Sequence, residues 1–209
     1  MAAVKKVALI TTSTRKPRVG PKVASVVHEI IKNDTDASSG VEITPVDVAD
    51  FNLPIYDEEV IPAMVPAKAS FSKPHTIAWS TEVGKYDAYI LVIPEYNFGI
   101  AGATKNAIDY LYNEWIGKPA AIVSYGIQGG TFASEQLNKA LTGMKLRVAE
   151  TRPSLKFHGG NGPDLFLAMG SGGLGEDTKK DIEAEAPIIL KAFQELKELL
   201  NAEKTQESA

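Results

Sequence analysis

Cysteine is absent from all 209 residues of the sequence. Its absence excludes disulfide bonds, thiol nucleophiles, and thiolate ligands for zinc or iron–sulfur clusters. Any redox chemistry would therefore need a bound organic cofactor or a metal held without thiolates. A chain without cysteine is compatible with a reducing compartment, and we expect a cytoplasmic protein.

Long hydrophobic runs are also missing. The apolar runs are short, as in residues 88–94, whereas about 20 consecutive apolar residues are needed to cross a bilayer. Residues 1–6 lead directly into a strand-like run, without the apolar segment and cleavage site of a secretory signal. We therefore expect a soluble protein that makes no use of a membrane.

Positive charge is too scarce for a protein that binds nucleic acid by neutralising phosphates. Lysine and arginine number 22 against 26 acidic residues, which gives a net charge of −4. The three histidines, His28, His75 and His158, lie in different segments, and there is no H-E-x-x-H sequence. We therefore predict no metal site.

Short apolar runs alternate with segments of helical periodicity along the chain. Pro21 suits the first turn of a helix, Pro94 is expected to end a strand, and Pro187 is expected to kink or restart the last helix. The predicted strands are residues 5–10, 41–48, 88–93, 120–124 and 146–150. The predicted helices begin near residue 21, within 70–84, near 104, after 130 and near 182.

This alternation of strands and helices predicts a parallel sheet with helices on both faces. Pro45 cannot donate a ladder hydrogen bond, so its strand belongs at a sheet edge. Five strands in the order 2-1-3-4-5 then give an α/β, flavodoxin-like three-layer sandwich. We expect one domain over residues 1–202, a disordered tail at 203–209, and a flap or surface loop in the glycine-rich segment 159–175.

Ligands of such sheets bind beyond the carboxyl ends of the strands, where three unusual loops should converge. The first loop, residues 11–20, combines hydroxyls, cations and a following helix N-terminus, a combination that favours a phosphate group. It matches neither G-x-x-x-x-G-K-[ST] nor G-x-G-x-x-G, which disfavours a nucleoside triphosphate or a Rossmann dinucleotide. A solvated basic loop is the alternative interpretation.

The other two loops, residues 94–102 and 124–130, combine aromatic side chains with glycines that let a ligand approach the backbone. A flat heteroaromatic ring with a polar edge would suit both loops. The alternative is ordinary packing of Tyr96, Phe98 and Tyr125 at the loop edges.

These segments resemble the NADPH-dependent FMN reductase family, and most of all its fungal quinone reductases, which also reduce free flavins and azo dyes. The Thr12–Arg15 segment is similar to the G-S-x-R phosphate loop of that family. The sequence departs from the family pattern at Thr12, which replaces a glycine, and at Thr104, which stands where leucine is favoured. The other matching segments are Pro94–Asn97, Lys105–Leu111, Gly117–Ala120, Ser124–Gly126 and Gly129–Gly130.

The resemblance implies an FMN cofactor, NAD(P)H as the electron donor, and a ping-pong transfer of hydride to a quinone, a free flavin or an azo dye. The flavin carries the chemistry, so no catalytic side chain is expected. The implied phosphate site consists of Ser13, Arg15, Arg18, Val19 and Gly20. The implied ribityl and ring site consists of Pro94, Glu95, Tyr96, Asn97 and Phe98, and the pyrimidine edge of the ring is expected to meet Ser124, Tyr125, Gly126 and Gly129.

The resemblance also implies a homodimer or a dimer of dimers, with the flavin near the subunit interface. The interface that we predict consists of Tyr110, Trp115 and the exposed side of the third helix, because aromatic side chains are enriched in such patches. Two other classes of function stay open at this point. One is a flavodoxin-like electron carrier that does not turn over NAD(P)H, and the other is a scaffold that has lost its flavin.

Overall fold

The computed structural model describes residues 4–34 and 40–202, so the predicted tail at 203–209 lies outside the described residues. The strands are β1 (Lys5–Thr11), β2 (Val41–Asp47), β3 (Ala88–Tyr96), β4 (Gly99–Ile100), β5 (Pro119–Gly126), β6 (Arg147–Val148) and β7 (Ser154–Lys156). The α-helices are α1 (Gly20–Asn33), α3 (Pro74–Gly84), α4 (Gly102–Asp109), α5 (Thr131–Gly143), α6 (Pro163–Ser171), α7 (Glu176–Ala184) and α8 (Ala186–Asn201), and two 3-10 turns lie at Val48–Phe51 and Pro62–Met64.

The sheet has the predicted flavodoxin-like order. Its parallel strands run β2-β1-β3-β5-β6, which is the order 2-1-3-4-5 when strands are counted along the parallel path. Pro45 lies in β2 at the edge, as predicted. The fifth strand differs from the prediction because it is divided: β6 pairs with the start of β5, and β7 pairs with its carboxyl end.

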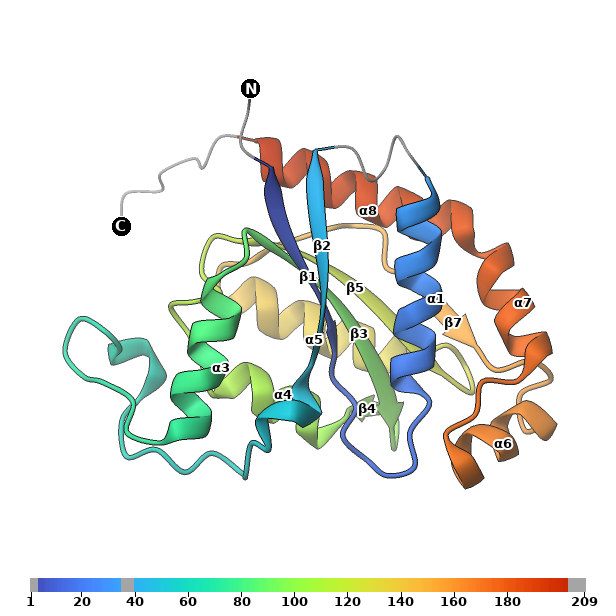
Figure 1. Ribbon diagram of the computed structural model, residues 1–209, viewed down its shortest axis with the longest axis horizontal. Helices are drawn as coiled ribbons and strands as arrows, with labels where there is room; N and C mark the ends of the chain where they lie inside the picture. Colours follow the sequence, from blue (N-terminus) through green and yellow to red (C-terminus); the bar gives the residue numbers. More distant parts are fainter. Residues whose placement is uncertain (1–3, 35–39, 203–209) are drawn as a thin grey trace.

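Helices cover both faces of the sheet and make the three layers visible in Figure 1. On one face α1, α7 and α8 share a core cluster with alternate residues of β1, such as Val7 and Leu9. On the other face α3, α4 and α5 pack against the intervening residues, such as Ala8 and Ile10. This alternation of sides is the period of two expected of a strand that is buried on both faces.

The prediction that Pro94 ends the third strand is wrong. β3 continues to Tyr96, because Glu95 and Tyr96 pair in an antiparallel ladder with the two residues of β4. Asn97 and Phe98 form the tight turn between β3 and β4, with positive φ values of 49° and 61°. The hairpin carries the sheet beyond the proline and projects over the carboxyl ends of the strands.

The third helix is shorter than its apolar pattern indicates, and this overturns the predicted interface residues. α4 ends at Asp109, and the side chains of Tyr110 and Trp115 are completely buried behind it. The Trp115 ring packs edge-on against Tyr89 with a centroid distance of 4.7 Å. Neither aromatic residue is available at the surface of this chain, so neither can contact a second subunit.

The segment 159–175 is more ordered than a flap or a surface loop, because it contains the nine residues of α6. The last helical stripe is divided into α7 and α8, and Pro187 lies in the first turn of α8, which is the predicted fresh start. Within the described residues, no helix is both long and apolar enough to cross a membrane.

Candidate functional site

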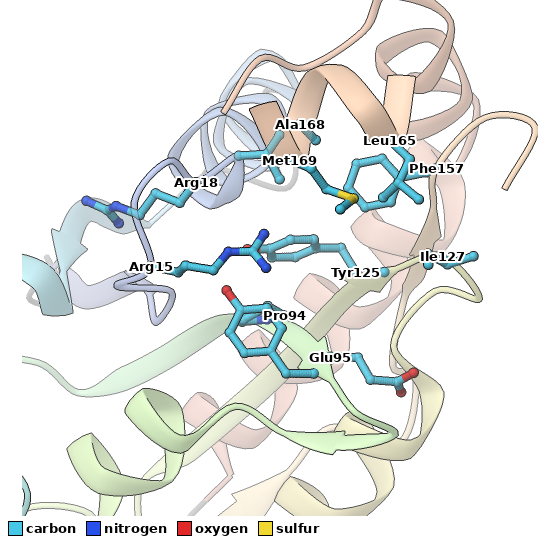
Figure 2. A pocket seen from close by; sticks show the side chains of 13 residues that line it. Arg15, Arg18, Pro94, Glu95, Tyr125, Ile127, Phe157, Leu165, Ala168 and Met169 are labelled. Carbon is cyan, nitrogen blue, oxygen red and sulfur yellow. The ribbon is translucent and has the colours of Figure 1, made fainter. Parts of the chain in front are cut away.

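A cavity of about 150 Å³, partly open to solvent, lies where the carboxyl ends of β1, β3 and β5 meet (Figure 2). The three loops that the sequence singled out therefore come together. The cavity is lined by Arg15, Arg18, Val19, Pro94, Glu95, Tyr96, Tyr125, Gly126, Ile127, Phe157, Leu165, Ala168 and Met169.

The loop between β1 and α1, beside the cavity, has the properties of an anion site, although Ser13 itself does not line the cavity. The side chain of Ser13 is almost fully buried, and among the described residues its Oγ has no hydrogen-bond partner. The adjacent N-terminus of α1 has no side-chain cap and no acidic residue in its first turn. A buried hydroxyl beside the positive end of a helix is stabilised when it binds an anion.

Gly20 lets the start of α1 pack directly against the hydroxyls of Ser13 and Tyr125. A Cβ atom at Gly20 would lie 2.1 Å from Ser13 Oγ and 2.7 Å from the Tyr125 hydroxyl. Burial is the main influence on Tyr125 and raises the pKa of its hydroxyl, against the opposing effects of Ser13, Arg15 and Arg18. The hydroxyls of Ser13 and Tyr125 lie close to each other, and the raised pKa keeps the Tyr125 hydroxyl protonated, so that it can donate a hydrogen bond.

The two arginines of the first loop have different surroundings. Arg18 makes a bidentate ion pair with Asp47 at 2.9 and 2.7 Å, and its Nη1 also donates to the Ser13 carbonyl at 2.7 Å. The hydrogen bond to Asp47 raises the pKa of Arg18. In Figure 2 the Arg18 side chain points away from the cavity and Arg15 points into it. Arg18 therefore fixes the loop to β2, and Arg15 is the cation free to meet a ligand.

The β3 end of the cavity presents an aromatic face. The Arg15 guanidinium lies 5.0 Å from the centre of the Tyr96 ring. Glu95 points toward α5, where its Oε2 accepts hydrogen bonds from the backbone N–H groups of Phe132 and Ala133 at 2.9 and 3.2 Å. Its carboxylate thus caps α5 and leaves only the backbone of Glu95 facing a ligand.

Other predicted residues shape the loops without lining the cavity. Asn97 and Phe98 form the β3–β4 turn, and the exposed Phe98 ring packs against Phe132. Ser124 is fully buried, and its Oγ donates to the Gly129 carbonyl at 2.8 Å. Gly129 in turn packs closely on Ser154.

Sequence reasoning missed one wall of the cavity. Ile127 comes from the predicted third loop, but Phe157, Leu165, Ala168 and Met169 come from the C-terminal part of the chain. The only sequence signal was an apolar cluster at residues 165–169 within a glycine-rich segment.

The two positions at which the resemblance implies a departure from the family pattern, Thr12 and Thr104, are neighbours in the structure. The hydroxyls of Thr12 and Thr104 lie 2.7 Å apart, and both residues are buried. Thr12 also donates to the Val92 carbonyl at 3.2 Å. The phosphate loop is therefore fastened to α4 and β3 through side chains.

Comparison with known proteins identifies the family of the chain. A sequence model of NADPH-dependent FMN reductases matches residues 5–157. The chain is 52% identical over 203 residues to the NAD(P)H-dependent FMN reductase ntnL of Nectria sp, which covers 95% of this chain and 98% of the relative. It is 32% identical over 196 residues to a quinone reductase of Pseudomonas putida, with 90% and 91% coverage.

Among solved structures, the flavoenzyme NAD(P)H:(acceptor) oxidoreductase FerB of Paracoccus denitrificans shares the fold. The TM-score is 0.60 at 23% identity, over 91% of this chain and 98% of FerB. No cluster of three potential metal ligands occurs in the described part of the chain. The matched segment contains the loops that build the anion site and the aromatic face, and the chain belongs to the NADPH-dependent FMN reductase family.

Proposed function

We propose that this chain binds FMN and transfers electrons from NAD(P)H to a quinone or a free flavin in two successive half-reactions. An azo dye is a further acceptor of the same flat aromatic class. Membership of the family and the activities named for the relatives from Nectria and Pseudomonas support the reaction class. We treat residues 1–202 as a single FMN-binding domain.

The observation that carries the proposal is the buried Ser13 hydroxyl without a hydrogen-bond partner at the uncapped start of α1. A phosphate there accepts hydrogen bonds from Ser13, from Tyr125 and from the helix N-terminus, while Arg15 supplies a counter-charge. Gly20 lets the Ser13 and Tyr125 hydroxyls lie close to the start of α1, and Val19 lines the adjacent cavity. Arg18 acts by holding the loop in this shape through Asp47.

The ring site that we propose lies between the second and third loops. Pro94, the Glu95 backbone and Tyr96 form one side, and Gly126 lets a ring approach the backbone. Asn97, Phe98, Ser124 and Gly129 set the shape of these loops. When bound, FMN supplies a ring that accepts a hydride from NAD(P)H and donates it to the acceptor, and the protein contributes position and electrostatics.

The first test is an absorbance spectrum of the protein after incubation with FMN and desalting, followed by anaerobic NADPH. We expect a retained flavin band that NADPH bleaches and a quinone restores. A retained band that NADPH cannot bleach would contradict the reductase and support an electron carrier. A protein that retains no flavin would contradict the cofactor site.

A second test asks whether Ser13 binds the phosphate. We expect Ser13→Ala to weaken FMN binding by about tenfold or more, from the loss of a hydrogen bond to a charged group, and to leave riboflavin binding unchanged. Flavin fluorescence titration measures both affinities. Ser134→Ala is the matched control, because Ser134 is also a buried serine without a hydrogen-bond partner but lies in α5, outside the first loop. Equal losses for FMN and riboflavin would show that Ser13 does not contact the phosphate.

A further inference from the structure

The two walls of the cavity differ in chemistry. The wall built by the three loops carries Arg15 and the Tyr96 ring, together with Glu95 and Gly126. The opposite wall contains only apolar side chains, and all of them come from residues 157–169 (Figure 2). Phe157, Leu165, Ala168 and Met169 make up this apolar wall, whose members beyond Phe157 belong to α6.

The apolar wall is fixed in position. Leu165 and Ala168 are buried in the same core cluster as Val19 and Val23 of the first loop and α1. Asp164 accepts a hydrogen bond at 2.7 Å from the backbone N–H of Thr178, in the first turn of α7. α6 is thus joined to the protein core and to the next helix before any ligand arrives.

The C-terminus of α6 is also tied directly to the phosphate loop. Gly172 has a φ of 70°, and a Cβ atom at this position would lie 2.6 Å from the Arg18 carbonyl oxygen. The two backbones therefore pack as closely as glycine allows. A wall held at both ends keeps a constant distance from the aromatic face opposite it.

Met169 is the member of the apolar wall that an incoming molecule can reach. Leu165 and Ala168 are at most 8% exposed, whereas Met169 is 53% exposed and also lines the cavity. A methionine side chain is flexible and polarisable, so it adapts to flat rings of different sizes. Phe166 is similarly exposed on the same helix but does not line the cavity.

The extent of the family match indicates which molecule the wall contacts. The match ends at residue 157 and contains every residue to which the proposed function gives an FMN contact. α6 lies entirely beyond it. We infer that Met169, supported by Phe157 and Leu165, is a specificity-determining residue that packs against the apolar ring of the electron acceptor and favours fused-ring quinones. This inference rests on the proposed function.

The experiment compares Met169→Ala, Met169→Leu and Phe166→Ala in the FMN-loaded protein. Calorimetric titration without NADPH gives the affinity of the oxidised protein for 2-methyl-1,4-naphthoquinone and for 1,4-benzoquinone. We expect Met169→Ala to weaken naphthoquinone binding about five- to tenfold, through loss of apolar contact area, and benzoquinone binding less than twofold. Met169→Leu keeps the side-chain volume and should restore the affinity, and Phe166→Ala should change neither.

Two further measurements separate this inference from the proposed function. FMN affinity and the rate of bleaching by NADPH should be the same in Met169→Ala as in the wild type, and kcat/KM for the naphthoquinone should fall by the same factor as its affinity. Equal losses for both quinones, or weakened FMN binding in Met169→Ala, would overturn the acceptor assignment and leave the proposed function standing. Failure of the wild-type chain to retain FMN would instead overturn the proposed function, and with it the basis of the inference.

Discussion

At the scale of single residues, Thr12 and Thr104 lie 92 positions apart in sequence and share a buried hydrogen bond. A threonine in place of glycine adds volume at the phosphate loop, and a threonine in place of leucine removes volume from α4. The two changes therefore compensate in space, and the new hydroxyls satisfy each other. The altered phosphate loop and the altered helix are a single structural feature.

This compensation predicts a strong coupling between the two positions. Thr104→Leu alone should crowd the Thr12 side chain and destabilise the fold by about 1–3 kcal/mol, the usual cost of overpacking. Thr12→Gly combined with Thr104→Leu should be less destabilised than the sum of the two single variants. Urea unfolding of the four proteins forms a double-mutant cycle, and additive free energies of unfolding would contradict the compensation.

Single residues also show how far the sequence predicts the site. Ser13 and Arg15 were placed in the phosphate loop because they follow a buried strand and precede a helix, and both facts are local. The structural roles of Arg18 and Glu95 were not predictable, because their partners are distant in sequence. Arg18 pairs with Asp47 on β2, and Glu95 accepts hydrogen bonds from two backbone N–H groups at the start of α5. A charged side chain that has no partner nearby in the sequence can form an ion pair or a hydrogen bond with an element that only the fold brings near.

At the scale of elements, α3 depends on a remote cap. Lys73 precedes the helix and provides no side-chain cap. The Glu58 carboxylate instead accepts hydrogen bonds from the backbone N–H groups of Ser72 and Lys73 at 2.8–3.0 Å. Burial beneath the loop raises the pKa of Glu58, but these hydrogen bonds outweigh it and the pKa lies below its ordinary value.

We therefore expect Glu58→Gln to destabilise the protein by about 1–2 kcal/mol at pH 7. Since folding lowers the pKa of Glu58, its stabilising effect is complete above the unfolded-state pKa of about 4.3 and is lost as the pH falls through the folded-state value. Denaturant unfolding from pH 7 to pH 3 should show the two proteins converge in acid. Glu59→Gln, at the exposed neighbouring position, is the control. A difference that stays constant with pH would rule out a carboxylate cap.

Some elements could be predicted from local sequence patterns, and others could not. Pro45 marked an edge strand and Pro187 a helix start, because the missing N–H constrains each position by itself. α6 was not predicted, because a helix of nine residues is only marginally stable alone. In this fold it is stabilised by the hydrogen bond between Asp164 and Thr178 and by the core cluster that it shares with Val19. The apolar wall of the site therefore follows from tertiary packing alone.

At the scale of the whole molecule, the exposed apolar side chains include Phe166, Leu167 and Met169 on α6 and a second group far from that helix. Ile55 and Ile61, in the loop before α3, are 89% and 68% exposed, and Ile77 on α3 is 47% exposed. Figure 1 shows that this loop and α3 lie at one end of the molecule and α6 at the other. Since Tyr110 and Trp115 are buried, this end replaces them as the surface on which a second copy would pack.

We accordingly expect sedimentation velocity to show a homodimer that Ile55→Asp or Ile61→Asp converts to monomer, because a charge buried without a partner in an interface is strongly unfavourable. Phe166→Asp is the matched control, since Phe166 is a similarly exposed apolar residue at the other end of the molecule and its replacement should leave the dimer intact. A dimer that survives both isoleucine substitutions would move the interface elsewhere, and a monomeric wild type would contradict the dimer itself. Because the proposed FMN contacts all come from one chain, the monomeric variants should still retain FMN after desalting, and loss of the flavin on dissociation would show that the partner completes the site.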